Sequence, residues 1–370
     1  MKRHGPSPRL PVDRLADLWP GDLDGLRVGA ILHAASTTSD LRPTLSVLEE
    51  LAASGRISLA ALFGPQHGFL STTQDNMVEW EGFRHPRLGI PVHSLYGEHR
   101  KPTPEMLSGV DVLFLDLVDV GARYYTFIWT MWLAMEAAAE AGLPMIVADR
   151  PNPIDGVTVE GRPQREDHLS FVGLLPIPIR HGRGIGELAR EFRDRHRPDL
   201  DLRVLPVEGW DRSRYLDETG LPWVTPSPNM ATIETAVVYP GMCLLEGTNV
   251  SEARGTTHPF EWFGAPWIDG ERLTRRLEDR GLPGVRFREI AFEPGFQKYS
   301  GEVCRGCQLH VRDRRRFRPV ESALAILEVI REDYPDDFRW KDPPYEYEHE
   351  KLPIEILCGR PLGEIDSTVA

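Results

Sequence analysis

The first half of the chain alternates short apolar runs with stretches of helical periodicity. Short apolar runs are typical of buried strands, and apolar residues that recur every three or four positions are typical of helices. The pattern predicts strands at residues 27–34, 58–64, 111–118, 144–149 and 175–179, and helices at 41–53, 127–141 and 184–193. This alternation favours a parallel sheet with helices on both faces.

The pattern changes in the second half. Residues 223–267 are rich in Pro, Gly, Ser and Thr and carry many polar groups between apolar runs. Around this section the pattern predicts strands at residues 202–207, 285–292 and 302–311, and helices at 269–280 and 320–333. We therefore predict an α/β protein with a parallel-sheet domain over residues 1–208 and a smaller α/β domain over residues 209–370. The aromatic tail after residue 336 is expected to wrap the body of the protein.

Polar side chains gather where the predicted strands end. In a parallel sheet, ligand-binding groups lie just beyond the carboxyl ends of the strands. The candidates at these junctions are Gln66, His67, Asp116, Asp119, Arg123, Tyr124, Tyr125, Asp149, Arg150, Asn152 and His181. The polar section 223–267 adds Asn229, Glu246, Asn249, Glu252 and Arg254.

Composition and charge exclude several classes of partner. The chain has 370 residues and a formal net charge of −13, which argues against nucleic acid and against an anionic membrane surface. The sequence contains neither a secretory signal nor an apolar run of about 18 residues, so we expect a cytoplasmic protein. Four cysteines and a single Cys-x-x-Cys at 304–307 predict reduced thiols and no zinc site. The glycine-rich nucleotide motifs are absent too, so no cofactor is expected.

Several longer motifs together carry a family resemblance. They read GPQHGF, SLYGEHRKPTPEML, DVLFLDLVDVGARYYTF, DRPNPIDG, SFVGLLPIPIRHG, PSPNM and YPGMCLLEGTNVSEARGTTHPFEWFGAPW. Over residues 29–359 the chain resembles the exo-acting β-N-acetylmuramidases of peptidoglycan recycling. The resemblance implies a Rossmann-like domain, a smaller α/β domain and an active-site cleft between them. It also implies removal of N-acetylmuramic acid from the non-reducing ends of peptidoglycan fragments.

Three positions depart from the family pattern. Many members read GPEHG, and that glutamate is the leading candidate for a catalytic acid, whereas this chain has Gln66. An amide neither donates nor accepts the catalytic proton, although it hydrogen-bonds sugars. Val118 replaces an amide of the family's DxQDVGAR motif, and residues 34–37 read AAST where the family has Asn-Pro-Thr-Gly.

Glycoside hydrolysis requires carboxyl groups on either side of a sugar ring. We predict Glu246, Glu252 and Asp116 as catalytic carboxylates and His67 as a proton shuttle. The remaining candidates are predicted to bind substrate, with Arg123 suited to the lactyl carboxylate of muramic acid.

Each of these assignments has a structural alternative. Glu246 or Glu252 forms an ion pair with Arg254 or Arg123, Asp119 caps the turn before Gly121, and the two tyrosines pack in the core.

Three functions remain open at this stage. The first is an exo-acting glycosidase that takes a small carbohydrate or muropeptide as substrate. The second is a sugar-binding protein without catalysis, which Gln66 and Val118 favour. The third is a metal-assisted hydrolase that uses His67, Asp116 and His181, for which the sequence offers no familiar ligand spacing. The oligomeric state is not predicted.

Overall fold

The computed structural model describes residues 7–75 and 77–365. Two compact units divide the chain. Unit 1 comprises Met1–Gly121, Tyr125–Val157 and Gly182–Pro228, and unit 2 comprises Ala122–Tyr124, Thr158–His181 and Asn229–Ala370. The predicted boundary after residue 208 stays a prediction.

Unit 1 contains a seven-stranded sheet in the order β3-β4-β2-β1-β5-β6-β7. Its strands are β1 (Leu26–Ile31), β2 (Ile57–Gly64), β3 (Phe83–Arg84), β4 (Pro91–Ser94), β5 (Val112–Leu115), β6 (Met145–Ala148) and β7 (Leu202–Leu205). Only the edge strand β3 is antiparallel to its neighbour. The central strands β5 and β6 are buried at every residue, because helices cover both faces of a doubly wound sheet.

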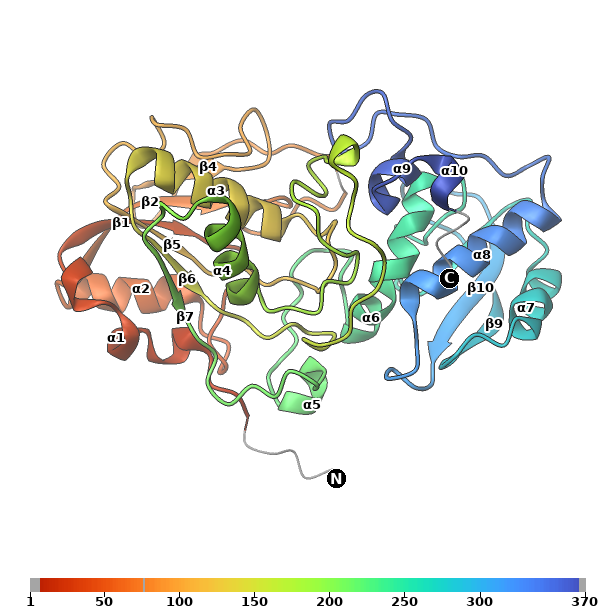
Figure 1. Cartoon of the computed structure of the whole chain (residues 1–370), viewed down its shortest axis with the longest axis horizontal. Helices are drawn as coiled ribbons and strands as arrows, with labels where there is room; N and C mark the ends of the chain where they lie inside the picture. Colours follow the sequence, from red (N-terminus) through yellow and green to blue (C-terminus); the bar gives the residue numbers. More distant parts are fainter. Residues whose placement is uncertain (1–6, 76, 366–370) are drawn as a thin grey trace. The chain divides into compact units, whose positions relative to one another are not determined.

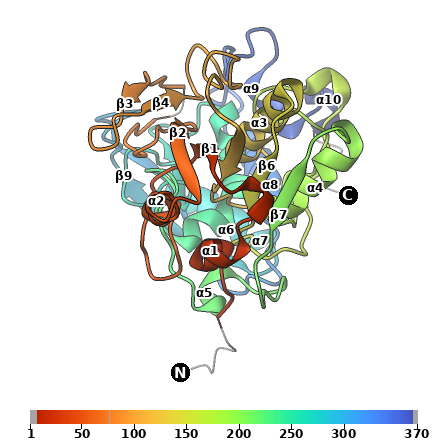
Figure 2. The ribbon, with the colours of Figure 1, turned by 90° about the vertical axis from the view of Figure 1, so that its left-hand side faces the viewer.

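The helices of unit 1 lie on both faces of this sheet. They are α1 (Leu15–Leu18), α2 (Thr44–Ala53), α3 (Phe127–Ala141), α4 (Ile185–His196) and α5 (Leu216–Thr219). Figure 1 labels them, and the view along the sheet in Figure 2 shows α1 and α2 on one face and α3 and α4 on the other. Trp129 of α3 stacks on Phe192 of α4 at 5.8 Å between ring centroids, which fixes these two helices against each other.

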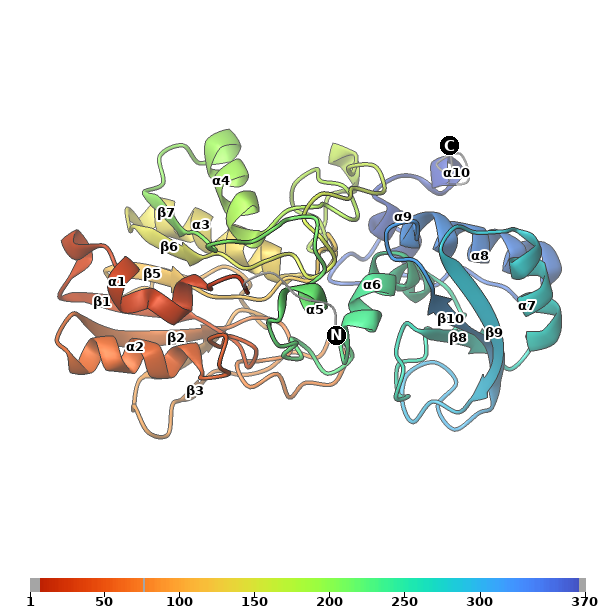
Figure 3. The ribbon, with the colours of Figure 1, turned by 90° about the horizontal axis from the view of Figure 1, so that it is seen from below.

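Unit 2 contains a three-stranded antiparallel sheet in the order β8-β10-β9, built from β8 (Trp262–Ala265), β9 (Val285–Phe292) and β10 (Cys304–Val311). Its helices are α6 (Ile233–Met242), α7 (Gly270–Asp279), α8 (Pro319–Asp333), α9 (Pro353–Cys358) and α10 (Leu362–Ile365). Figure 3 shows α7 and α8 on one side of the sheet. Strands β9 and β10 alternate buried and exposed residues over much of their length, as expected of a sheet with one covered face.

Most predicted elements are confirmed within a few residues. The helix predicted at 127–141 and the strand predicted at 285–292 have the predicted bounds. The strand predicted at 175–179 is wrong, because the segment has no regular structure. Pro176 and Pro178 alternate there and remove two backbone donors that a strand ladder would require. The pattern also missed β3, β4, β8 and α6, the last of which contains Pro240.

Candidate functional site

The carboxyl edge of the seven-stranded sheet brings together the junctions that the sequence singled out. Strands β1, β2, β5 and β6 are parallel, so the residues that follow them lie at the same edge. The sheet order changes direction between β1 and β5, and ligands bind at such a switch point in open α/β sheets.

A buried ion pair stands at this edge. Arg150 Nε lies 2.6 Å from Asp116 Oδ1, and its Nη2 lies 2.7 Å from Oδ2. Thr44 Oγ1 donates to the same carboxylate at 2.6 Å, and Arg150 Nη2 also donates to the carbonyl of Thr37 at 2.7 Å. Asp116 is fully buried. Both of its oxygens are therefore engaged in holding Arg150 in place, which is a geometry for positioning and not for proton transfer.

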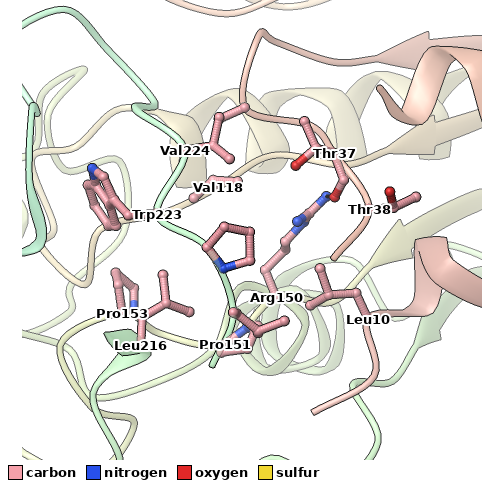
Figure 4. A pocket seen from close by; sticks show the side chains of 13 residues that line it. Leu10, Thr37, Thr38, Val118, Arg150, Pro151, Pro153, Leu216, Trp223 and Val224 are labelled. Atoms are coloured by element: carbon pink, nitrogen blue, oxygen red, sulfur yellow. Dashed lines mark hydrogen bonds between the residues drawn. The ribbon is translucent and has the colours of Figure 1, made fainter. Parts of the chain in front are cut away.

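A pocket opens beside Arg150. It encloses about 460 Å³ of empty space, part of it open to solvent, and proline, leucine and valine side chains form most of its wall. Figure 4 shows Trp223 and Val118 on this wall, with Arg150, Thr37 and Thr38 as its polar groups. Among the described residues, no hydrogen-bond partner is found for the Thr37 hydroxyl or for Arg150 Nη1. The pocket therefore has the composition of a small-ligand site, an apolar wall with a few directed polar groups.

Gln66 sits in a hydrogen-bond network of its own. Thr126 Oγ1 donates to Gln66 Oε1 at 2.6 Å, and Gln66 Nε2 donates to Tyr96 Oη at 3.0 Å. The backbone N–H of Met77 donates to the same tyrosine oxygen at 3.0 Å. The amide thus accepts through its oxygen and donates through its nitrogen. An ionised carboxylate at this position would have no hydrogen to donate to Tyr96.

Two histidines lie close to this network. His67 adopts a left-handed backbone with φ of 69°, and its Nδ1 lies 2.8 Å from the carbonyl of Thr73, so Nδ1 carries a proton. His33 was not predicted. Its Nε2 accepts from the Val118 N–H at 3.1 Å. Burial, together with the charge of Arg150, lowers the pKa of His33 to about 3, so this imidazole is neutral at physiological pH.

Asp149 and Asn152 support the loop that follows β6. Asp149 Oδ1 accepts from the N–H groups of Arg150 and Gly186, both at 2.8 Å. Burial raises the pKa of Asp149 to about 6, although these two hydrogen bonds oppose the shift. Asn152 accepts from the Ile154 N–H and donates to the carbonyl of Arg183. A turn that satisfies its own polar groups explains both side chains.

Asp119 caps the turn before Gly121, which was the structural alternative to a role in substrate binding. Its Oδ2 accepts from the Gly121 N–H at 2.7 Å. Gly121 has φ of +84°, and a Cβ there would lie 2.6 Å from Asn152 Oδ1, so only glycine fits.

In unit 2 the predicted carboxylates form one buried charge cluster. Arg254 Nη2 lies 2.7 Å from Glu246 Oε1, and Arg254 Nε lies 3.5 Å from Glu252 Oε1. Lys298 Nζ lies 2.8 Å from Glu252 Oε2, and Tyr345 Oη donates to Glu246 Oε2 at 2.7 Å. The ion pairs of the structural alternative are thus present.

The electrostatics of the cluster keep Glu246 and Arg254 charged. Burial raises the pKa of Glu246, but the charge of Arg254 and the hydrogen bonds from Arg254 and Tyr345 outweigh it and hold this pKa below its usual value. Burial lowers the pKa of Arg254, and the two carboxylates more than compensate. A carboxylate that stays ionised is a poor proton donor but a good stabiliser of positive charge.

Other predicted binding residues of unit 2 have structural partners. Tyr124 donates to the carbonyl of Pro240 and packs edge-on against Tyr239. Arg123 is fully buried and donates to the carbonyls of Ile177 and Leu357. Asn249 binds backbone groups of Asp337 and Arg339, as the predicted wrapping of the tail requires. The remaining predicted residues of both units, Tyr125, His181 and Asn229, are buried.

The part of the chain that the structure describes contains no group of three His, Cys, Asp or Glu side chains that could hold a metal ion. His67, Asp116 and His181 are therefore no such group. Within the same residues, no helix has both the length and the apolar character needed to cross a membrane.

Comparison with known proteins matches nearly the whole chain to one family. A family model described as the N-terminal part of the exo-beta-N-acetylmuramidase NamZ matches residues 28–234, and the model of its C-terminal part matches residues 237–363. The chain is 45% identical over 335 residues to the peptidoglycan beta-N-acetylmuramidase NamZ of Bacillus subtilis strain 168, covering 90% of this chain and 80% of the relative. The chain belongs to the NamZ family of exo-β-N-acetylmuramidases.

Solved structures agree on the NamZ fold. A DUF1343 family protein from Bacteroides fragilis has a TM-score of 0.85 at 32% identity, and the match covers 98% of this chain and 91% of that one. A second DUF1343 family protein from the same organism has a TM-score of 0.72 at 25% identity, with 97% and 91% covered. The family resemblance and the fold class predicted from the sequence are confirmed.

Some residues at the carboxyl edge of the seven-stranded sheet were not predicted from the sequence. Thr37, Tyr96, Thr126 and Trp223 contribute polar or aromatic groups there. Thr37 follows β1 and Thr126 precedes α3, so the rule about strand ends pointed to their neighbourhood. Tyr96 follows β4, a strand that the pattern missed, and Trp223 opens the polar section 223–267 but was not predicted as a site residue.

Proposed function

We propose that this protein is an exo-β-N-acetylmuramidase that releases N-acetylmuramic acid from the non-reducing ends of peptidoglycan fragments. One observation carries the proposal: 45% identity to a peptidoglycan β-N-acetylmuramidase over 90% of the chain. The substrate would be a muropeptide or a related small carbohydrate. A cytoplasmic location, as predicted from the sequence, belongs to the same proposal.

The direct test is product release by the purified full-length chain. The substrate is a disaccharide with N-acetylmuramic acid β-1,4-linked to N-acetylglucosamine, and free N-acetylmuramic acid is quantified by chromatography. The control substrate is the dimer of N-acetylglucosamine, which lacks the lactyl ether. We expect release from the first substrate and none from the second. Absence of release from both, by wild-type protein and by the Gln66→Glu variant, would contradict the proposal.

The charge cluster of unit 2 supports a role for Glu246 and Glu252 in this reaction. The transition state of glycoside hydrolysis carries positive charge on the sugar ring, and ionised carboxylates stabilise such charge. Glu246 is held ionised by Arg254, and Glu252 contacts Lys298 at 2.8 Å. We assign them electrostatic stabilisation and not proton donation. Asp116 is assigned the positioning of Arg150.

Proton donation then falls to His67. Gln66 cannot donate the catalytic proton, and His67 is the next residue in the chain. Its Nδ1 donates to the Thr73 carbonyl, so we assign the proposed proton transfer to Nε2. His67→Gln should lower kcat about 10²–10⁴-fold and remove the alkaline limb of the pH–rate profile. A variant that loses rate but keeps the profile would assign His67 a purely structural role.

Gln66 favours a second candidate function, sugar binding without catalysis. The amide is engaged by Thr126 and Tyr96 in place of the acid found in many relatives. Calorimetry with the same disaccharide separates the two functions. Saturable binding without any turnover would support the second, and measurable turnover would exclude it.

A further inference from the structure

An arginine-lined pocket in unit 2 is not used by the proposed reaction. It encloses about 960 Å³ of empty space, part of it open to solvent. Arg162, Arg318 and Arg360 all line it, together with Glu160 and Glu321. Arg318 immediately precedes α8, and Arg360 follows α9 by two residues. Three guanidinium groups from separate parts of the sequence thus meet at one cavity.

Arg360 is the buried member of this group. Its exposed fraction is 6%, yet it forms no ion pair with any residue between 7 and 365 that the structure describes. Its one hydrogen bond runs from Nη2 to the carbonyl of Pro163 at 3.2 Å. Burial, and then the like charge of Arg162, lower the pKa of Arg360. The charge of Glu364 opposes this shift, although no acid within the described residues forms an ion pair with Arg360. A buried cation without an ion pair is costly, and such groups in proteins are normally paired.

The other two arginines form no ion pair with an acid among the described residues, although the charge of Arg318 acts on Glu160. Arg162 is exposed and forms neither a hydrogen bond nor an ion pair with the described part of the chain. Arg318 Nη1 donates only to the carbonyls of Arg315 and Phe317, at 2.9 and 3.1 Å. None of these three cations forms an ion pair in the described part of the chain, although the formal net charge of the chain is −13.

The two acids of the pocket do not neutralise this group. Glu160 lies 3.5 Å from Arg180 and accepts from the Val320 N–H, so another cation already compensates its charge. Burial raises the pKa of Glu160, and the charges of Arg180 and Arg318 oppose that shift. Glu321 is exposed to solvent, where its field is screened.

We propose that this pocket is a binding site for an oxyanion, a carboxylate or phosphate group carried by a small molecule. The planar guanidinium presents paired N–H groups that match the oxygens of such anions. Arg360 supplies the desolvated charge, and Arg162 and Arg318 approach the anion from the more open side. The inference is independent of the proposed glycosidase activity, because it concerns binding at a separate group of residues in unit 2.

The test measures binding of inorganic phosphate and of acetate to the full chain, in the absence of any peptidoglycan fragment. Titration calorimetry and thermal unfolding are both run at constant ionic strength, with chloride replaced by the probe. We expect saturable binding of at least one probe and a rise in Tm. A preference for phosphate or for acetate identifies which oxyanion the pocket takes.

Variants then locate the site. Arg162→Ala and Arg318→Ala should each weaken binding about tenfold, the usual effect of losing a charge-assisted hydrogen bond. Arg360→Met should abolish binding. The matched control is Arg312→Ala, which removes the same charge from an exposed residue of the same basic run outside the pocket.

Two results would overturn the inference. One is the absence of saturation with both probes. The other is equal weakening in the pocket variants and in Arg312→Ala, which would indicate a general charge effect. If Arg360→Met does not fold, the variants of the exposed Arg162 and the half-buried Arg318 still show whether the anion binds in this pocket. The binding test contains no sugar substrate, so its result does not depend on glycosidase activity. A protein that binds phosphate through these arginines but releases no N-acetylmuramic acid would support this inference and contradict the proposed function.

Discussion

Two buried charge networks, one in each unit, compensate buried carboxylates with cations in different ways. In unit 1, Asp116 and Arg150 form a one-to-one bidentate pair, with Thr44 as an additional donor. In unit 2, one arginine is shared by two carboxylates, and Lys298 and Tyr345 complete the set. Both networks contain residues that the sequence presented as catalytic carboxylates.

The two networks differ in whether a charged hydrogen-bond donor remains after the pairs have formed. The pair in unit 1 directs Arg150 towards a pocket and keeps one of its nitrogens available there. The cluster in unit 2 is balanced, with two acids facing two cations. A balanced cluster holds its carboxylates ionised at fixed positions, whereas a pair with a spare donor offers that donor to a ligand.

We expect the largest loss of stability when the shared arginine, Arg254, is replaced. Arg254→Met leaves Glu246 and Glu252 buried with Lys298 as their remaining cation, and it should lower the free energy of unfolding by about 5 kcal/mol. Urea denaturation measures this. Adding Glu246→Gln should recover part of the loss. The control is Arg275→Met, which breaks an exposed pair with Glu271 and should cost less than about 1 kcal/mol. Equal losses in both variants would contradict the comparison.

A smaller loss is expected in unit 1. Asp116→Asn keeps an acceptor for Thr44 but leaves Arg150 without its counter-charge, and we expect a loss of about 3 kcal/mol by the same denaturation assay. Asp111→Asn is the matched control, because Asp111 pairs with Arg27 at the surface. A loss at Asp116 as large as that at Arg254 would show that sharing one cation between two acids carries no extra cost.

The third prediction concerns a carboxyl group held by backbone donors alone. Asp149 has a pKa of about 6 because of burial, above the ordinary value near 3.8. A raised pKa favours the protonated form in the folded state, so its stabilising contribution is present below about pH 4 and is lost as pH rises through 6. Asp149→Asn should therefore exceed the wild type in stability by up to about 3 kcal/mol above pH 6 and match it near pH 4.

The measurement is the free energy of unfolding as a function of pH. Asp111 provides the opposite sign, because hydrogen bonds from Arg27 hold its pKa at about 2. Its contribution is present above the unfolded pKa and is lost as pH falls. A pH profile of Asp149→Asn parallel to that of the wild type would mean that backbone donors hold Asp149 as well as a cation would.

Much of the fold followed from local pattern. The apolar strands and the helix at 127–141 were identified because periodicity is a property of neighbouring residues. The segment with Pro176 and Pro178 shows the limit, since an apolar run alone did not reveal the missing backbone donors. Strand β8 pairs with β10, which lies much later in the sequence, and β3 is too short to show a periodic pattern, so no local signal announced either strand.

The candidate site also has features that the sequence determined and features that only the tertiary structure determined. The sequence determined which chemistry stands at the strand ends, and through its long motifs it determined the family. Only the tertiary structure decided which charged groups meet, because Asp116 and Arg150 are 34 residues apart and Glu252 and Lys298 are 46 apart. Whether a carboxylate is paired or available depends on the atoms within a few ångströms of it. For these residues the chain does not bring those atoms together until it folds.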